Sequence, residues 1–277
     1  MVELGKINTL KVVKMLDFGA YLDGEDLGEI LLPTRYIPEA YAIGDQIDVF
    51  VYLDTDDLPI ATTELPKVMV EECAYLKVVE VNAVGAFLDW GLPKDLLVPF
   101  GEQQKPMKVG ESYVVYVFID DASHRITASS KLDKFLADSS LYYKEQQKVS
   151  LLICGRTDLG YRAVVDDTVM GLIFNSDVFK PIHYGELLTG YIKTIRPDNK
   201  LDLALQLVNR EALDALSREI LGFIKSQGGK TTLTDKSSAG EINQQFGVSK
   251  SSYKKALGKL YKKRLILIEK TQITLVK

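Results

Sequence analysis

The strongest constraint on the fold of this chain of 277 residues is a sequence repeat. The segment GAYLD begins at Gly19, and the closely similar GAFLD begins at Gly85, which is 66 residues further along. The same offset aligns other turn and apolar positions without a gap: Leu31 with Leu97, Pro33 with Pro99, Gly44 with Gly110 and Ile60 with Ile126. A repeat of this length predicts several copies of one small structural unit rather than a single large domain.

A third copy follows at a further offset of 75 residues, where Gly160 takes the place of Gly85. In every copy a second glycine follows the first after 25 residues, at Gly44, Gly110 and Gly185. Apolar positions keep the same register, so the copies agree in spacing and in residue type. We therefore expect three units with one fold.

Each copy contains five short apolar runs. In the first copy they cover residues 7–16, 19–23, 29–33, 46–54 and 59–63. The runs are rich in Val, Ile, Leu and Tyr and are separated by Gly, Asp and Pro, which is typical of β-strands joined by turns. Five strands in about 60 residues is the size of an OB-type barrel. Helices do not alternate with these strands, which argues against a parallel α/β fold.

The sequence pattern changes after Leu207. Residues 211–224 have apolar side chains at helical spacing. Ser238 and Glu241 form a capping box that begins a second helix, residues 250–263 predict a third helix, and residues 264–276 predict a hairpin. This order predicts a winged helix. The expected fold is mainly β with an α+β C-terminal domain, that is, three tandem OB-fold barrels followed by a winged helix-turn-helix. The predicted domains are residues 1–66, 67–131, 148–208 and 209–277, with a linker at 132–147.

Charge is distributed unevenly, although the whole chain carries a net charge of only −4. Residues 1–66 contain 13 acidic and 4 basic side chains, a net charge of −9. Residues 209–277 contain 14 basic and 6 acidic side chains, a net charge of +8. A polyanion is therefore expected to meet the C-terminal region first.

Several functional classes are disfavoured by the composition. The apolar runs are much shorter than the roughly 18 residues of a membrane-spanning helix, and the N-terminal residues lack the pattern of a signal peptide. The two cysteines, Cys73 and Cys154, lie in separate strand-like runs, which favours a reducing environment. We expect a cytoplasmic protein without membrane contact.

No pattern of catalytic or metal-binding residues stands out. The two histidines, His124 and His183, have no recognisable nucleophile or carboxylate partner in the sequence. Acidic residues near Asp54 and Asp120 fall at predicted turns, where aspartate hydrogen-bonds the local backbone. The assigned domains leave no segment for a catalytic domain, so we expect no enzyme activity, no cofactor and no metal.

The aromatic residues around the first GAYLD segment define a candidate binding surface. Phe18 and Tyr21 would point to opposite faces of a regular strand. A bulge at Gly19 would turn both rings outward and leave Ala20 and Leu22 facing the interior. Two exposed rings form a platform for nucleic-acid bases, each of which contributes about 1–3 kcal/mol by stacking. The alternative is that these rings belong to the core.

The repeat resembles the S1 RNA-binding domain, a variety of the OB fold. The resemblance rests on the GAYLD and GAFLD segments, on the Gly-Asp or Gly-Glu pair before the fourth strand, and on residues 121–129, which are similar to the last S1 hairpin. It implies a nucleic-acid face made of aromatic residues on the second strand, the end of the third strand and the last hairpin.

Carried over by position, this face differs between the copies. The first ring position is held by Phe18, Val84 and Leu159, and the second by Tyr21, Phe87 and Arg162. A ring position on the third strand is held by Pro33, Pro99 and Phe174, and the hairpin base by Pro59, Arg125 and Lys200. The guanidinium of Arg162 can itself stack on a base. Because affinity depends on neutralised phosphates, we expect the acidic first copy to bind RNA most weakly and to pack against a neighbour or a protein partner.

The third predicted helix of the C-terminal domain combines an apolar stripe with basic side chains. The stripe consists of Tyr253, Ala256, Leu257, Leu260 and Tyr261. The basic side chains from which we expect phosphate contacts are Lys250, Lys254, Lys255 and Lys259. In winged helices such a helix can enter a nucleic-acid groove, and lysines favour backbone contact over base reading. The alternative is a solvated face or a protein docking surface.

Three S1-like copies followed by a winged helix resemble the conserved virulence factor B family of bacterial cytoplasmic RNA-binding proteins. The resemblance implies a non-catalytic, post-transcriptional regulatory factor, and stacking with phosphate neutralisation implies single-stranded RNA as its partner. Two other interpretations stay open. One is an interaction scaffold that contacts the ribosome or RNA polymerase, and the other is a DNA-binding transcription regulator led by the winged helix.

Overall fold

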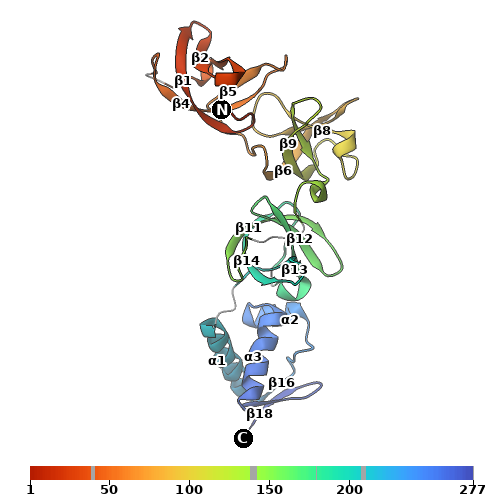
Figure 1. Cartoon of the computed structure of the whole chain (residues 1–277). Coiled ribbons are helices and arrows are strands. Elements are labelled where there is room, and N and C mark those ends of the chain that lie inside the picture. Colours follow the sequence, from red (N-terminus) through yellow and green to blue (C-terminus); the bar gives the residue numbers. More distant parts are fainter. Residues whose placement is uncertain (39–40, 138–141, 179, 207–209, 277) are drawn as a thin grey trace. The chain divides into compact units, whose positions relative to one another are not determined.

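The computed structural model describes residues 1–38, 41–137, 142–178, 180–206 and 210–276. By its internal contacts the chain divides into two compact units, Met1–Leu136 and Ala137–Lys277. Figure 1 shows strands in the three repeats, and in the part of the chain that the structure describes the α-helices lie in the C-terminal region. The predicted fold class is confirmed. The division lies inside the predicted linker 132–147, and the individual domain boundaries stay a prediction.

The first copy is a closed barrel of five strands. Its strands are β1 (Ile7–Leu16), β2 (Gly19–Asp23), β3 (Glu29–Pro33), β4 (Gln46–Leu53) and β5 (Pro59–Thr62). They follow the order β1-β2-β3-β5-β4, with β3 and β5 parallel. Along β4 the side chains of Ile47, Val49 and Val51 are buried in the barrel core, as the alternation of the sequence predicts.

The third copy has the same closed topology. Its strands are β11 (Lys148–Arg156), β12 (Gly160–Val165), β13 (Val169–Phe174), β14 (Leu187–Ile195) and β15 (Leu201–Ala204). The order is β11-β12-β13-β15-β14, again with a parallel pair between β13 and β15. The repeated sequence therefore produces a repeated topology.

The second copy is a nearly closed version of this barrel. Its strands are β6 (Cys73–Val81), β7 (Gly85–Asp89), β8 (Leu96–Pro99), β9 (Ser112–Ile119) and β10 (Ile126–Ser129). Their order is β10-β9-β6-β7-β8. The edge strands β8 and β10 lie beside each other. No backbone ladder joins these two strands among the residues that the structure describes.

The second strand of every copy begins with a glycine, Gly19, Gly85 or Gly160, which we call the marker glycine. Glycine is required at this position because the neighbouring strand approaches it closely. It pairs with the last residue of the third strand, Pro33, Pro99 or Phe174. A Cβ added at Gly85 would lie 2.3 Å from the carbonyl oxygen of Val98, and one at Gly160 would lie 2.0 Å from that of Ile173. Only glycine fits such a contact without a shift of the backbone.

The expected bulge at Gly19 is wrong, because the irregularity lies in the preceding strand. It falls between Val12 and Lys14 in β1, between Val78 and Glu80 in β6, and between Ile153 and Gly155 in β11. Phe18 lies in the turn before β2, and its ring still meets that of Tyr21 edge to face, with centroids 6.3 Å apart. Ala20 and Leu22 are buried, as expected.

Two aromatic residues of the first barrel join the hydrophobic core of the second barrel, although the first barrel also has a core of its own. Phe50 and Tyr52 lie on the outer face of β4, yet both are buried in a cluster with Trp90 of the second barrel. The rings of Phe50 and Trp90 meet edge to face, with centroids 5.7 Å apart. The backbone N–H of Val70 also donates to the carbonyl of Gly5 over 3.0 Å. The acidic first copy thus packs against its neighbour in the chain.

The C-terminal domain has the expected winged-helix order. It consists of α1 (Arg210–Ser226), β16 (Lys230–Thr231), α2 (Ala239–Phe246), α3 (Lys250–Lys262), β17 (Ile266–Ile268) and β18 (Ile273–Leu275), with sheet order β16-β18-β17. The capping box of α2 is confirmed: the Ser238 N–H donates to the Glu241 carboxylate over 2.8 Å, and the Glu241 N–H donates to Ser238 Oγ over 3.2 Å. The hydrogen bond from Ser238 lowers the pKa of Glu241.

The apolar stripe of α3 is shorter than predicted. Tyr253, Ala256, Leu257 and Leu260 are buried, whereas Tyr261 is 53% exposed. Tyr261 therefore does not belong to the core. No helix in the described part of the chain is long and apolar enough to cross a membrane.

Candidate nucleic-acid interface

Cationic side chains from three elements converge on one face of the third barrel. Arg162 projects from β12, Arg196 follows β14, and Lys200 precedes β15. All three line an open pocket of about 450 Å³, together with Leu159. The repeat brings these residues together because the second strand and the last hairpin of this barrel lie on the same face. Two of the three cations, Arg162 and Lys200, were predicted as site residues.

An aromatic ring with two neighbouring cations lies at the end of the third strand of the same barrel. The guanidinium of Arg196 is 5.5 Å from the ring centroid of Phe174, and the ammonium of Lys193 is 5.9 Å from it. Arg196 Nε donates to Asp202 over 2.6 Å, and Lys193 is 2.6 Å from the buried carboxylate of Asp177. These ion pairs hold both cations in place beside the half-buried ring, where a base and its phosphate could be bound together.

The first barrel has the best pair of rings but little positive charge. Phe18 is 56% exposed, and Tyr21 is half-buried with the ammonium of Lys14 at 5.5 Å from its ring centroid. The net charge of −9 over residues 1–66 opposes a polyanion there. This geometry agrees with the expectation that the first copy is the weakest RNA binder, which stays a prediction.

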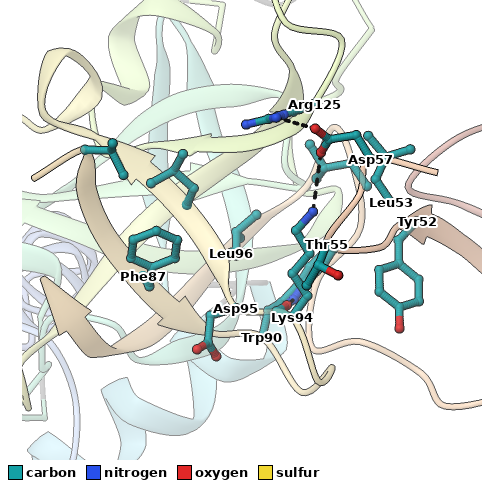
Figure 2. A pocket seen from close by; sticks show the side chains of 13 residues that line it. Tyr52, Leu53, Thr55, Asp57, Phe87, Trp90, Lys94, Asp95, Leu96 and Arg125 are labelled. Carbon is teal, nitrogen blue, oxygen red and sulfur yellow. Dashed lines mark hydrogen bonds and ion pairs between the residues drawn. The ribbon is translucent and has the colours of Figure 1, made fainter. Parts of the chain in front are cut away.

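The predicted binding face of the second barrel forms a pocket with the β4–β5 turn of the first barrel. Phe87 and Arg125, two predicted site residues, line this pocket of about 410 Å³. Figure 2 shows Asp57 of the first barrel linked to both Arg125 and Lys94, with Phe87 elsewhere on the pocket wall. The nitrogen of Lys94 is 3.6 Å from the Asp57 carboxylate. Arg125 is therefore engaged by an acidic side chain from the neighbouring barrel.

Local hydrogen bonds fix the turn that carries Asp57. The carboxylate of Asp54 accepts the backbone N–H groups of Asp56, over 2.8 Å, and Leu58, over 3.0 Å. Asp57 has a positive φ of 61°, which aspartate tolerates better than most residues. The interpretation of these aspartates as turn residues is confirmed.

The corresponding turn of the second barrel shows the same chemistry. The Asp120 carboxylate accepts from the Ser123 hydroxyl over 2.7 Å and from the Ser123 N–H over 2.9 Å. These hydrogen bonds lower the pKa of Asp120. His124 lies exposed in this turn with φ of 56°.

The lysines predicted on α3 differ in their surroundings. Lys254 and Lys255 are exposed, whereas Lys250 is half-buried and donates to the Lys236 carbonyl over 3.4 Å. Lys259 forms an ion pair with Asp214 of α1. Lys254 and Lys255 are therefore the members of the predicted set most exposed to a phosphate.

Two further lysines extend the basic surface toward the end of α3. A shallow pocket of about 640 Å³ is lined by Lys255 and Lys259 together with Lys262 and Lys263. Lys262 and Lys263 were not included among the predicted phosphate contacts.

Three residues near the candidate sites were missed by the sequence analysis: Lys94, Lys193 and Arg196. The sequence repeat could have pointed to Arg196, because this position holds Asp121 in the second copy and Thr55 in the first. Only the third copy has a cation there. Lys94 aligns with Gly28, so it is also specific to its copy. The motif of the family did not include these positions.

Comparison with known proteins supports this organisation. The model of the S1 domain matches residues 4–64, and that of the CvfB-like winged helix domain matches residues 218–275. Both are nucleic-acid-binding domain types. The chain is thus a tandem S1-type protein with a C-terminal winged helix.

The family resemblance expected from the sequence is confirmed. The chain is similar to conserved virulence factor B of Staphylococcus epidermidis, with 25% identity over 99% of this chain and 95% of that protein. It is 26% identical to conserved virulence factor B of Staphylococcus aureus over 99% of this chain and 94% of that protein. A Bacillus subtilis protein with the name YitL is 29% identical over 93% of this chain and 89% of its own length.

A solved structure also aligns with the full chain. It is a multidomain protein with nucleic acid binding domains from Streptococcus pneumoniae, 23% identical, with a TM-score of 0.42 and coverage of 99% of this chain and 98% of that chain.

Proposed function

We propose that this protein is a non-catalytic factor that binds single-stranded RNA and acts in post-transcriptional regulation. The observation that carries the proposal is the open pocket of the third barrel, which Arg162, Arg196 and Lys200 line, with the guanidinium of Arg196 also 5.5 Å from the ring centroid of Phe174. Cations in such an arrangement neutralise successive phosphates, and the ring and guanidinium groups offer stacking surfaces for unpaired bases. Duplexes hide their bases from such surfaces.

The basic C-terminal domain supports the same function from a second position. Its net charge of +8 over residues 209–277 and the exposed Lys254 and Lys255 favour contact with the phosphate backbone. Lysines bind phosphate as point charges and do not distinguish bases well. We therefore expect affinity with little sequence preference from this domain and stacking from the barrels.

The test measures binding of the full chain to matched single-stranded RNA, single-stranded DNA and duplex DNA by fluorescence anisotropy over a salt series. We expect a preference for single-stranded RNA and a steep fall in affinity between about 50 and 200 mM salt. Preference for duplex DNA would indicate a transcription regulator instead. Absence of binding to all three would indicate a scaffold for the ribosome or RNA polymerase.

A pair of matched variants tests the site itself. Arg162→Ala with Lys200→Ala should weaken RNA binding and reduce the slope of log affinity against log salt by about 0.7 for each phosphate that is no longer neutralised. Lys148→Ala with Lys180→Ala removes the same charge from exposed positions of the same barrel outside the pocket. Equal losses of affinity in both double variants would contradict a specific role for the pocket.

A further inference from the structure

The pocket between the first two barrels combines an apolar wall with a charged rim. Val84, Phe87 and Leu97 of the second barrel form part of the wall. The rim contains Arg125 and Lys94 of the second barrel and Asp57 of the first. Its volume of about 410 Å³ is in the range of pockets that bind small organic ligands. The first barrel therefore completes a cavity on the face where the second barrel would bind RNA.

A carboxylate occupies the cationic rim of this pocket. Asp57 forms ion pairs with Arg125 and with Lys94, and the Lys94 ammonium also donates to the carbonyl of Asp54. The side chains of Asp57 and Arg125 are 35% and 54% exposed. Ion pairs with this exposure are weak, because solvent screens them. A phosphate can therefore replace the carboxylate on the same two cations.

The cationic rim is specific to the second copy. At the repeat offsets, Lys94 aligns with Gly28 in the first copy and with Val169 in the third. Arg125 aligns with Pro59 and with Lys200. Two cations thus surround the Asp57 carboxylate at the barrel whose face is met by an acidic turn, while a second carboxylate, Asp95, lines the same pocket. That turn is held rigidly by the Asp54 carboxylate, which fixes the position of Asp57.

We propose that the inter-barrel pocket binds one nucleotide of single-stranded RNA, whose phosphate displaces the Asp57 carboxylate from Arg125 and Lys94. Phe87 receives the base, and Asp57 is an internal competitor that lowers the affinity of the pocket. A ligand without an anion leaves the ion pairs in place, and an anion without a base gains nothing from the apolar wall. The inference rests on the proposed function and adds a second, regulated site to it.

The single tryptophan of the chain reports on this pocket. Trp90 lines the cavity and is 3% exposed, and its indole N–H donates to the carbonyl of Lys94 over 2.6 Å. A nucleotide bound in the cavity changes the surroundings of the indole ring that lines it. Because the chain contains one tryptophan, a change in its fluorescence can be assigned to the environment of this pocket.

The experiment titrates the full-length protein with a single-stranded RNA hexamer of mixed sequence. Trp90 fluorescence follows the pocket, and anisotropy of the labelled hexamer follows total binding. Asp57→Asn should lower the dissociation constant seen by Trp90 about two- to fivefold, since the two weak ion pairs of Asp57 with Arg125 and Lys94 are removed. Asp56→Asn removes the same charge from an exposed position in the same turn and should leave this constant unchanged.

A second variant keeps the proposal testable if Asp57→Asn disturbs the interface between the barrels. Arg125→Ala should raise the dissociation constant seen by Trp90, and adding Asp57→Asn should then lower this constant by less than it does in the wild-type background, because the Arg125 contact of Asp57 is already absent and the Lys94 contact remains. Saturation of anisotropy without a change at Trp90, or equal effects of Asp57→Asn and Asp56→Asn, would overturn the inference and leave RNA binding intact. No change in anisotropy would overturn the proposed function as well.

Discussion

At the scale of single residues, the marker glycine shows what a sequence can and cannot define. The sequence repeats the same spacing of glycine and apolar residues in three copies, which predicted the position of the glycine. The structure confirms that this glycine opens the second strand. Its physical role was predicted wrongly, because glycine serves bulges, positive φ angles and close approaches alike. Only the neighbouring strand distinguishes these roles, and for Gly85 that neighbour is the Val98 carbonyl.

The close approach at Gly85 leads to a prediction about stability. Gly85→Ala places a Cβ 2.3 Å from a backbone oxygen, so strands β7 and β8 must separate, at a cost of about 1–3 kcal/mol. Urea unfolding of the full chain, followed by Trp90 fluorescence, measures the free energy of unfolding. Gly101→Ala is the matched control, because nothing lies within 4 Å of its added Cβ. Equal free energies of unfolding for the two variants would show that β8 moves away from the added Cβ without loss of stability.

Single positions also limited the prediction of the site. Arg162 and Lys200 were found because they occupy motif positions of the S1 resemblance, and the structure brings them to one pocket. Arg125 was found in the same way, but its partner Asp57 was not. The two residues are 68 positions apart in the sequence. Such a contact depends on how two barrels pack against each other. The sequence pattern within one copy carries no information about that packing.

At the scale of elements, strands were predictable where one face meets the core of the same barrel. The expected first, second and third strands of the first copy, residues 7–16, 19–23 and 29–33, agree with β1, β2 and β3. The alternation of residues in the sequence of β4 places Ile47, Val49 and Val51 on the inward face, where all three are buried in the barrel core. It also placed Phe50 and Tyr52 on the outer face, where both are nevertheless buried against the second barrel. An outward aromatic residue looks the same in sequence whether it meets water or a neighbouring domain.

The position of α3 in the winged helix depends on one buried tyrosine. Tyr253 stacks on Phe246 of α2, with ring centroids 5.3 Å apart, and its hydroxyl donates to the Leu233 carbonyl over 2.9 Å. Burial raises the pKa of Tyr253 from 10.0 to about 12. The unfolded chain therefore ionises first as pH rises, and the stability that the neutral hydroxyl contributes is present below pH 10.0 and lost toward about pH 12.

Tyr253→Phe tests this element. At neutral pH we expect a loss of about 1 kcal/mol in the free energy of unfolding, since the variant lacks the hydrogen bond to the Leu233 carbonyl. Phenylalanine does not titrate, so the difference in stability between wild type and variant should narrow as pH rises from 10.0 to about 12. Urea unfolding followed by circular dichroism of the helices at several pH values measures both effects. A difference independent of pH would contradict the assigned pKa shift.

At the scale of the whole molecule, the parts of the chain differ in net charge and in how they pack against one another. The most acidic segment, residues 1–66, places its outer aromatic residues in a core shared with the second barrel. Exposed lysines of the proposed RNA-binding surface, Lys200, Lys254 and Lys255, lie in the third barrel and the winged helix. The sequence predicted this gradient from charge counts alone. The shared core required the structure, because neither copy differs from an independent barrel in its strand pattern.

The shared core predicts that the first two barrels unfold together. Phe50→Ala removes a ring of the first barrel that packs on Trp90 of the second, and loss of a buried phenylalanine costs about 3–5 kcal/mol. Hydrogen exchange of the full chain should then increase to a similar extent in β1–β5 and in β6–β10. Phe18→Ala removes an exposed ring from the same barrel and should leave both unchanged. Faster exchange confined to β1–β5 in Phe50→Ala would show that the barrels are stable independently, and that the contact holds them together without coupling their unfolding.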